Sequence, residues 1–157
     1  MTPPSGKNTN DEGEMIDILL VEPNQGDVRL FEENLKQGKI LNSIHTVSDG
    51  EAALDFVNQQ GEYEEVPRPD LILLEPQLPG KSGMEVLSEL NNEPELQEIP
   101  VIILTSSEVG KEIVKSHGLE ADEYIRKPVE AEEFVSFVKE VEDFWLAVVQ
   151  NNGKSDE

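Results

Sequence analysis

The sequence predicts an α/β protein with a doubly wound, five-stranded parallel sheet in the strand order 2-1-3-4-5. Short, almost wholly apolar runs recur at 16–21, 71–74 and 99–104. Such runs, bounded by turn formers, are typical of strands buried on both faces. Segments with apolar residues at helical spacing lie between them, and this alternation implies right-handed crossovers with helices on both faces of the sheet. Of the common doubly wound orders, five strands suit 2-1-3-4-5.

Turn and cap signals set the bounds of each element. Asn24 is a suitable N-cap for the first helix, and Pro76 ends the central strand because proline cannot continue the ladder. The strands are expected at 16–21, 40–47, 71–74, 99–104 and 121–126. The helices are expected from Asn24 to near Gly38, from 48–50 to 57, from Gly80 to 91–94, from about 108 to 116, and over 131–150.

The expected domain covers 14–150. The polar segments at 1–13 and 151–157 are predicted to be disordered tails. The chain has no apolar run long enough to span a membrane and no start typical of a signal peptide, so we expect a cytoplasmic protein. It has no cysteine, which excludes disulfides and thiolate metal sites.

Charge is the extreme feature of the composition. The chain has 34 Asp and Glu against 12 Lys and Arg, a net charge of −22. This field repels nucleic acid and anionic membranes, so neither is an expected partner. The acids are spread along the whole chain, which favours adaptation to a salt-rich cytoplasm over one acidic face for a basic partner. At ~1 M salt the screening length is only about 3 Å, so the self-repulsion is tolerated.

Four polar residues follow predicted strands: Glu22, Glu75, Thr105 and Lys127. The carboxyl ends of parallel strands meet at one edge of a sheet, where ligands bind in such folds. Two carboxylates could share Mg²⁺, and a hydroxyl and an ammonium suit phosphoryl oxygens. Together they describe a phosphoryl-transfer site with a carboxylate as acceptor.

These residues stand in motifs that resemble the receiver domain of two-component response regulators over about 14–149. The motifs are ILLVE, DLILLEPQLPGKSGMEVL, IPVIILTSS and EYIRKP. The stretches GDVRL, PRPDLILL, LPGKSG and the FW of the last helix are most similar to the single-domain regulators of bacterial phytochrome-type kinases. The resemblance implies a flavodoxin-like topology and a sensor histidine kinase, or another signalling protein, as partner.

Two departures from the family bear on function. The family's phosphoacceptor is an aspartate, and Glu75 stands at its position; Pro23 replaces the acid that is usually the direct metal ligand. The resemblance makes Thr105, Tyr124 and Lys127 the switch and phosphate-binding equivalents. It makes Glu22, Glu75 and the carbonyl of Gln77 the metal site, where we expect Mg²⁺ to bind weakly or not at all, with no other cofactor.

The sequence therefore predicts a single-domain pseudo-receiver that is not an enzyme and acts by protein–protein contact without phosphorylation. One alternative is a phosphorylatable, Mg²⁺-dependent receiver with residual activity. Another, from a different class, is a flavodoxin-type flavin protein, which would need a Ser/Thr/Gly-rich phosphate loop where EPNQGD stands.

The last helix carries apolar residues beyond its core stripe. The residues outside that stripe are Val135, Phe144, Leu146 and Val149, whereas Trp145 lies on it. Those expected to contact a partner or a second copy of the chain are Phe144, Trp145, Leu146 and Val149. A second apolar face suggests a homodimer, and the resembled family uses this helix for dimers. A membrane-surface role is disfavoured by the acids on the same helix.

Overall fold

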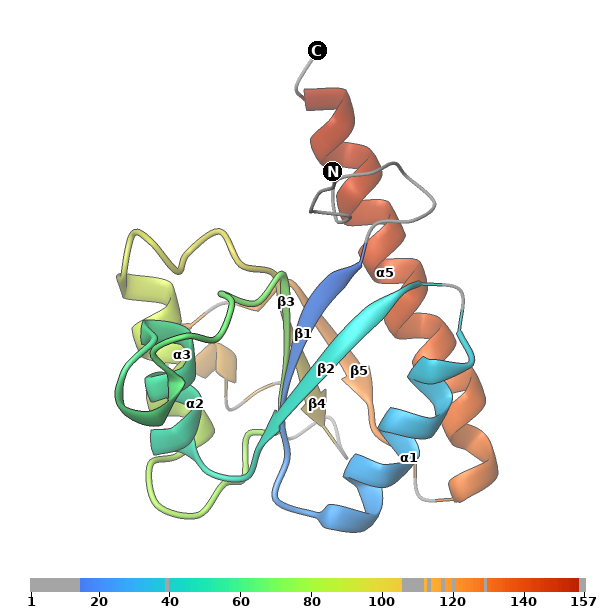
Figure 1. The fold of residues 1–157 in the computed structure, drawn as a ribbon, viewed down its shortest axis with the longest axis horizontal. Helices are drawn as coiled ribbons and strands as arrows, with labels where there is room; N and C mark the ends of the chain where they lie inside the picture. Colours follow the sequence, from blue (N-terminus) through green and yellow to red (C-terminus); the bar gives the residue numbers. More distant parts are fainter. Residues whose placement is uncertain are drawn as a thin grey trace.

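The protein folds as one five-stranded sheet between two helical layers (Figure 1). A computed structural model describes residues 15–38, 40–105, 112, 114–116, 118–119, 121–128 and 130–155. The strands are β1 (Ile16–Val21), β2 (Asn42–Val47), β3 (Leu71–Leu74), β4 (Val101–Thr105) and β5 (Glu123–Arg126). The helices are α1 (Gln25–Lys36), α2 (Gly50–Asn58), η2 (Gly61–Tyr63), α3 (Gly83–Asn92), η3 (Ala131–Glu133) and α5 (Phe134–Ser155).

All neighbouring strands are parallel, and their order is β2-β1-β3-β4-β5, which confirms the predicted topology. Alternate residues of the central strands point to opposite faces. Leu19 and Ile72 belong to the core cluster under α2 and α3, whereas Leu20 and Leu73 belong to the cluster under α1 and α5. The all-apolar runs are therefore needed because both faces of the sheet are covered.

The strand and helix bounds differ from expectation mainly where apolar runs extend beyond the paired backbone. β2 begins at Asn42 rather than Ile40, β4 covers Val101–Thr105 rather than 99–104, and β5 begins at Glu123 rather than Ala121. Directly before β4, Pro100 has no N–H, and only its carbonyl oxygen pairs with the neighbouring strand, where it accepts from the N–H of Ile72 at 3.0 Å. The sequence pattern therefore placed the starts of these strands too early in the chain.

Other expectations concern the ends of the chain and the loops. A short 3₁₀ helix, η2, follows α2, and another, η3, precedes α5. The predicted end of the last helix at Gln150 is wrong, because α5 continues to Ser155. The predicted tail at 1–13 lies outside the described residues, as does much of the helix expected at 108–116.

The long helix α5 begins at the edge of the sheet where the strands end and runs beyond the opposite edge (Figure 1). Its buried stripe consists of Phe134, Phe137, Val138 and Val141. Among the described residues, no helix is both long enough and apolar enough to cross a membrane.

Candidate functional site

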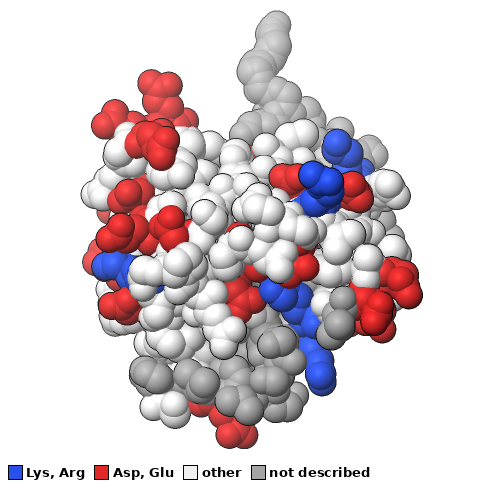
Figure 2. Space-filling view, turned by 90° about the horizontal axis from the view of Figure 1, so that it is seen from below, with Lys and Arg blue, Asp and Glu red and all other residues white. Residues whose placement is uncertain are grey.

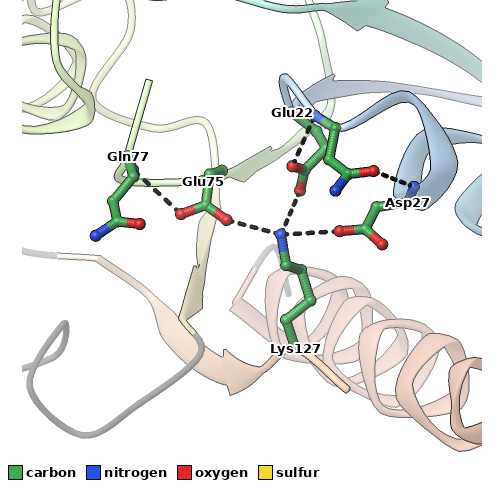
Figure 3. Close-up of polar contacts among 6 residues, drawn as sticks. Glu22, Asp27, Glu75, Gln77 and Lys127 are labelled. Atoms are coloured by element: carbon green, nitrogen blue, oxygen red, sulfur yellow. Dashed lines mark hydrogen bonds and ion pairs between the residues drawn. The ribbon is translucent and has the colours of Figure 1, made fainter. Parts of the chain in front are cut away.

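Three side chains from separate strand ends meet at the edge of the sheet where β1, β3 and β5 end (Figure 3). Glu22 directly follows β1, Glu75 directly follows β3, and Lys127 directly follows β5. In this topology β1 and β3 are neighbours at the point where the strand order reverses, which is where ligands bind in doubly wound folds. The order of the strands therefore accounts for the meeting of residues 105 positions apart in the chain.

The ammonium group of Lys127 is surrounded by three carboxylates (Figure 3). Its Nζ lies 2.8 Å from Oε1 of Glu75, 2.9 Å from Oε1 of Glu22 and 3.1 Å from Oδ2 of Asp27. The contacts with Glu22 and Glu75 are charge-assisted hydrogen bonds, in which the ammonium donates to a carboxylate oxygen. The contact with Asp27 is an ion pair.

Asp27 is the member of this cluster that sequence reasoning missed. It lies in the first turn of α1, where Asn24 is the predicted N-cap: Oδ1 of Asn24 accepts from the N–H of Asp27 at 3.0 Å. The sequence offered only a partial signal, since a helix that starts beside the strand ends brings its first turn near the site but does not fix which of its side chains reaches it. Its membership of the GDVRL stretch alone did not reveal a contact with Lys127.

The two glutamates are held by backbone donors as well as by the lysine. Oε2 of Glu22 accepts from the N–H of Asn24 at 3.2 Å, and Oε2 of Glu75 accepts from the N–H of Gln77 at 3.1 Å. The loop after Glu75 is tied down by a bond of 3.0 Å from the N–H of Gly83 to the carbonyl of Pro76. A side chain at Gly83 would overlap that backbone, which explains the glycine. The carboxylates are therefore fixed from both sides.

Burial makes the electrostatics of the cluster strong. The side chain of Glu22 is 1% exposed, and that of Lys127 is 14% exposed. Burial raises the pKa of Glu22 above its ordinary value, because the attraction of one ammonium shared among three acids does not offset it. Burial alone would lower the pKa of Lys127, but hydrogen bonds to Glu75 and Glu22 raise it above its ordinary value, so the lysine is charged.

The other predicted site residues are Gln77, Tyr124 and Thr105, and the ion pairs that the structure describes for Lys127 are with the three carboxylates rather than with these residues. Gln77 meets the site through its backbone N–H, and its side chain is exposed. Tyr124 is half-buried and lines an open hollow with Lys115, Leu119 and Ala121. The backbone of Thr105 pairs with Arg126 at the end of β4, but its side chain is outside the described part of the structure.

The residues expected to form a second apolar face on α5 do not share one face. Successive residues turn by about 100°, so Phe144 lies on the opposite flank of the helix from Leu146. Phe144 and Trp145 pack against the core cluster, whereas Leu146 and Val149 are 41% and 44% exposed. Val135, 64% exposed, is on the flank of Leu146. The exposed apolar surface is therefore smaller than the sequence suggested.

Acidic side chains lie at several separate places on the described surface around the site (Figure 2). Figure 2 looks onto the end of the molecule where the strands end, and it shows red groups on several parts of the rim with basic groups in only a few places. The excess of acids is therefore not confined to one patch on this face, as their spread along the sequence predicted.

Comparisons with known proteins agree with the fold and the motifs. The model of the response regulator receiver domain matches residues 18–139. The response regulator Rcp1 of Synechocystis sp. is 42% identical over 132 residues, which cover 84% of this chain and 90% of that protein.

The alignments with two similar crystal structures include nearly the whole chain of each of those structures. The phosphorylated cyanobacterial phytochrome response regulator RcpA superposes with a TM-score of 0.78 at 40% identity, covering 85% of this chain and 96% of the other. The Mn²⁺-bound form of Rcp1 superposes with a TM-score of 0.76 at 42% identity, covering 83% and 94%. The family match favours the receiver interpretation over the flavodoxin-type one. Fold, motifs and relatives together show that the chain belongs to the response regulator receiver domain family.

Proposed function

We propose that this chain is a pseudo-receiver, a member of the receiver family that signals by protein–protein contact without being phosphorylated. The observation that carries the proposal is the contact of 2.8 Å between Oε1 of Glu75 and Nζ of Lys127. Glu75 stands where the family motif has its phosphoacceptor aspartate. In this chain the side chain at that position is already paired with the lysine that the resemblance assigns to phosphate binding.

The chemistry of Glu75 supports this proposal. Its extra methylene places the carboxylate farther from the backbone by one C–C bond, about 1.5 Å. In-line transfer is sensitive to such a change, since a misplacement of about 1 Å can reduce the rate ~100-fold. A glutamate also has a single negative charge, whereas a phosphoryl group has nearly two. Glu75 is therefore a poor acceptor and a partial mimic of a phosphorylated aspartate.

The names of the relatives suggest the signalling context. RcpA is called a cyanobacterial phytochrome response regulator, and a further similar structure, 34% identical, is called a bacteriophytochrome response regulator. We infer that the partner of this chain is a sensor histidine kinase of the phytochrome type, in the cytoplasm. The net charge of −22 supports salt adaptation and speaks against nucleic acid as a partner.

The proposal is tested by the response of the folded protein to a small phosphodonor. We expect the amide NMR spectrum of the wild-type chain to be unchanged when acetyl phosphate and Mg²⁺ are added together. Glu75→Gln, which weakens the pairing with Lys127, should shift the amide signals of Tyr124 and Lys127. Glu89→Gln, at an exposed position on α3, is the matched control and should leave them in place.

A donor-dependent shift of these signals in the wild-type chain, absent with Mg²⁺ alone, would show that the chain accepts a phosphoryl group. That result would favour the alternative of a phosphorylatable receiver and overturn the proposal.

A further inference from the structure

We propose that the cation of this site is the protein's own Lys127, held among Glu22, Glu75 and Asp27, and that the Mg²⁺ implied by the receiver family does not fit the residues present. The inference rests on the proposed function and concerns the same site. It means that the conformation of the site residues does not depend on the concentration of divalent cations.

The carboxylate oxygens that a metal would need are already engaged. Both oxygens of Glu22 accept hydrogen bonds, one from Lys127 and one from the N–H of Asn24. Both oxygens of Glu75 do so as well, one from Lys127 and one from the N–H of Gln77. A divalent cation between these glutamates would have to displace the ammonium from both at once.

Asp27, on helix α1, is the third carboxylate beside the ammonium of Lys127. It reaches Lys127 from the first turn of α1, at 3.1 Å, and its side chain is 23% exposed. Because Glu22 and Glu75 follow strands of the sheet, they hold the ammonium from one side, and Asp27 holds it from the helix. Without Asp27 the ammonium would lose one of the three carboxylates with which it forms ion pairs.

Pro23 leaves the loop after β1 without the metal ligand that the family has there. Its side chain has no donor oxygen, and it stands where the family motif has the acid that is usually the direct metal ligand. Mg²⁺ requires near-octahedral oxygen coordination. Among the described residues, no group of three or more His, Cys, Asp or Glu side chains is arranged to hold a metal ion.

The test is calorimetric titration with Mn²⁺ at constant ionic strength. The wild-type chain should show no saturable heat at low-millimolar metal. Lys127→Ala removes the ammonium and leaves three carboxylates free to close on a cation, so it should gain saturable binding, at least tenfold tighter than any binding by the wild type. Lys139→Ala makes the same change of charge at an exposed position on α5 and should resemble the wild type.

Asp27→Asn in the Lys127→Ala background should remove most of the gained binding. If Lys127→Ala loses its native circular dichroism, Lys127→Gln serves in its place. Saturable binding of Mn²⁺ by the wild-type chain would overturn the proposal. It would also be overturned if Lys127→Ala and Lys139→Ala bound the metal equally.

This outcome is separate from that of the proposed function. Metal binding by the wild-type chain with no phosphodonor response would overturn only the assignment of Lys127 as the cation of the site. A phosphodonor response would overturn the pseudo-receiver proposal, whatever the titration showed.

Discussion

Nζ of Lys127 lies 2.9 Å from Oε1 of Glu22, a carboxylate that is only 1% exposed. This pair joins the ends of β1 and β5, which are separated by β3 and β4 in the sheet. Buried ion pairs add little net stability compared with apolar residues, but removing one partner leaves an uncompensated charge. Substituting one member of the pair should therefore change the free energy of unfolding measurably.

Lys127→Met should destabilise the protein strongly. We expect the free energy of unfolding to fall by about 3 kcal/mol, because Glu22 is left buried without its cation. Urea unfolding at neutral pH measures this change. Lys139→Met, an equal change of charge at an exposed site, should alter the free energy by less than about 0.5 kcal/mol. Equal effects of the two substitutions would show that the cluster is not an electrostatic unit.

Glu22 should give stability an unusual dependence on pH. Burial raises the pKa of its carboxyl above 4.5, so the folded protein binds this proton more tightly than the unfolded chain does. The resulting stabilisation is complete below the unfolded pKa and is lost as the pH rises through the folded pKa.

The measurement compares the wild-type chain with Glu22→Gln, which cannot titrate at this position. The stability of the wild type relative to Glu22→Gln should increase as the pH falls from neutral through the raised folded pKa toward the ordinary value of 4.5. Glu89→Gln, at an exposed position, should show no such trend relative to the wild type. A relative loss of wild-type stability on acidification would mean that the pairing with Lys127 outweighs burial.

Salt should stabilise the protein. With a net charge of −22 on one small domain, screening relieves self-repulsion, so the melting temperature should be higher in ~2 M than in ~0.1 M KCl. Thermal melts followed by circular dichroism test this. An equal or lower melting temperature at high salt would contradict salt adaptation and favour an acidic surface for a basic partner.

Self-association through α5 remains a prediction of the sequence. Leu146 and Val149 are exposed on the part of the helix near its C-terminal end. If a second copy packs there, Leu146→Glu with Val149→Glu should shift the protein toward monomer in sedimentation velocity experiments, because the introduced charges oppose an apolar contact. Ser136→Glu, at an exposed position near the start of the helix and outside the predicted contact, is the control. A wild-type chain that is monomeric throughout would contradict a homodimer.

The fold could be predicted because its signals are local. The four residues of β3 are apolar and bounded by prolines, and the structure has that strand at the predicted positions. Strand order followed from alternation and connection rules. The starts of β2, β4 and β5 were less accurate. In β2 and β4 the reason is that Ile40 and Ile99 pack partly buried against the core clusters without pairing in the sheet, so they give the same apolar signal as strand residues.

The site was predictable only in part. Glu22, Glu75 and Lys127 could be brought together from their places after strands, since topology alone sets that edge. Asp27 could not be placed by the same reasoning, because its contact depends on how α1 leans over the sheet and on the rotamer of a side chain. The apolar residues of α5 were also misjudged as one face, since core packing of Phe144 depends on neighbours that are distant in the sequence.

The contribution of each departure from the family can be separated by substitution. If the extra methylene of Glu75 were the only defect, Glu75→Asp would accept a phosphoryl group from a small donor. We expect Glu75→Asp alone to remain a poor acceptor. We expect acceptance when Pro23→Asp is added, because the new carboxylate would be a ligand for Mg²⁺, and phosphoryl transfer needs the positive charge of that ion near the transferred group. Lys127→Ala should abolish the rescued acceptance, because it removes the fixed ammonium of the site.

The most direct test of the account is the intact mass of the wild-type chain after incubation with acetyl phosphate and Mg²⁺, beside Glu75→Asp, Pro23→Asp and the double substitution. We expect only the double substitution to gain the mass of one phosphoryl group to a substantial extent. Robust gain of that mass by the wild-type chain would contradict the account, because a glutamate held by Lys127 would then be a working acceptor.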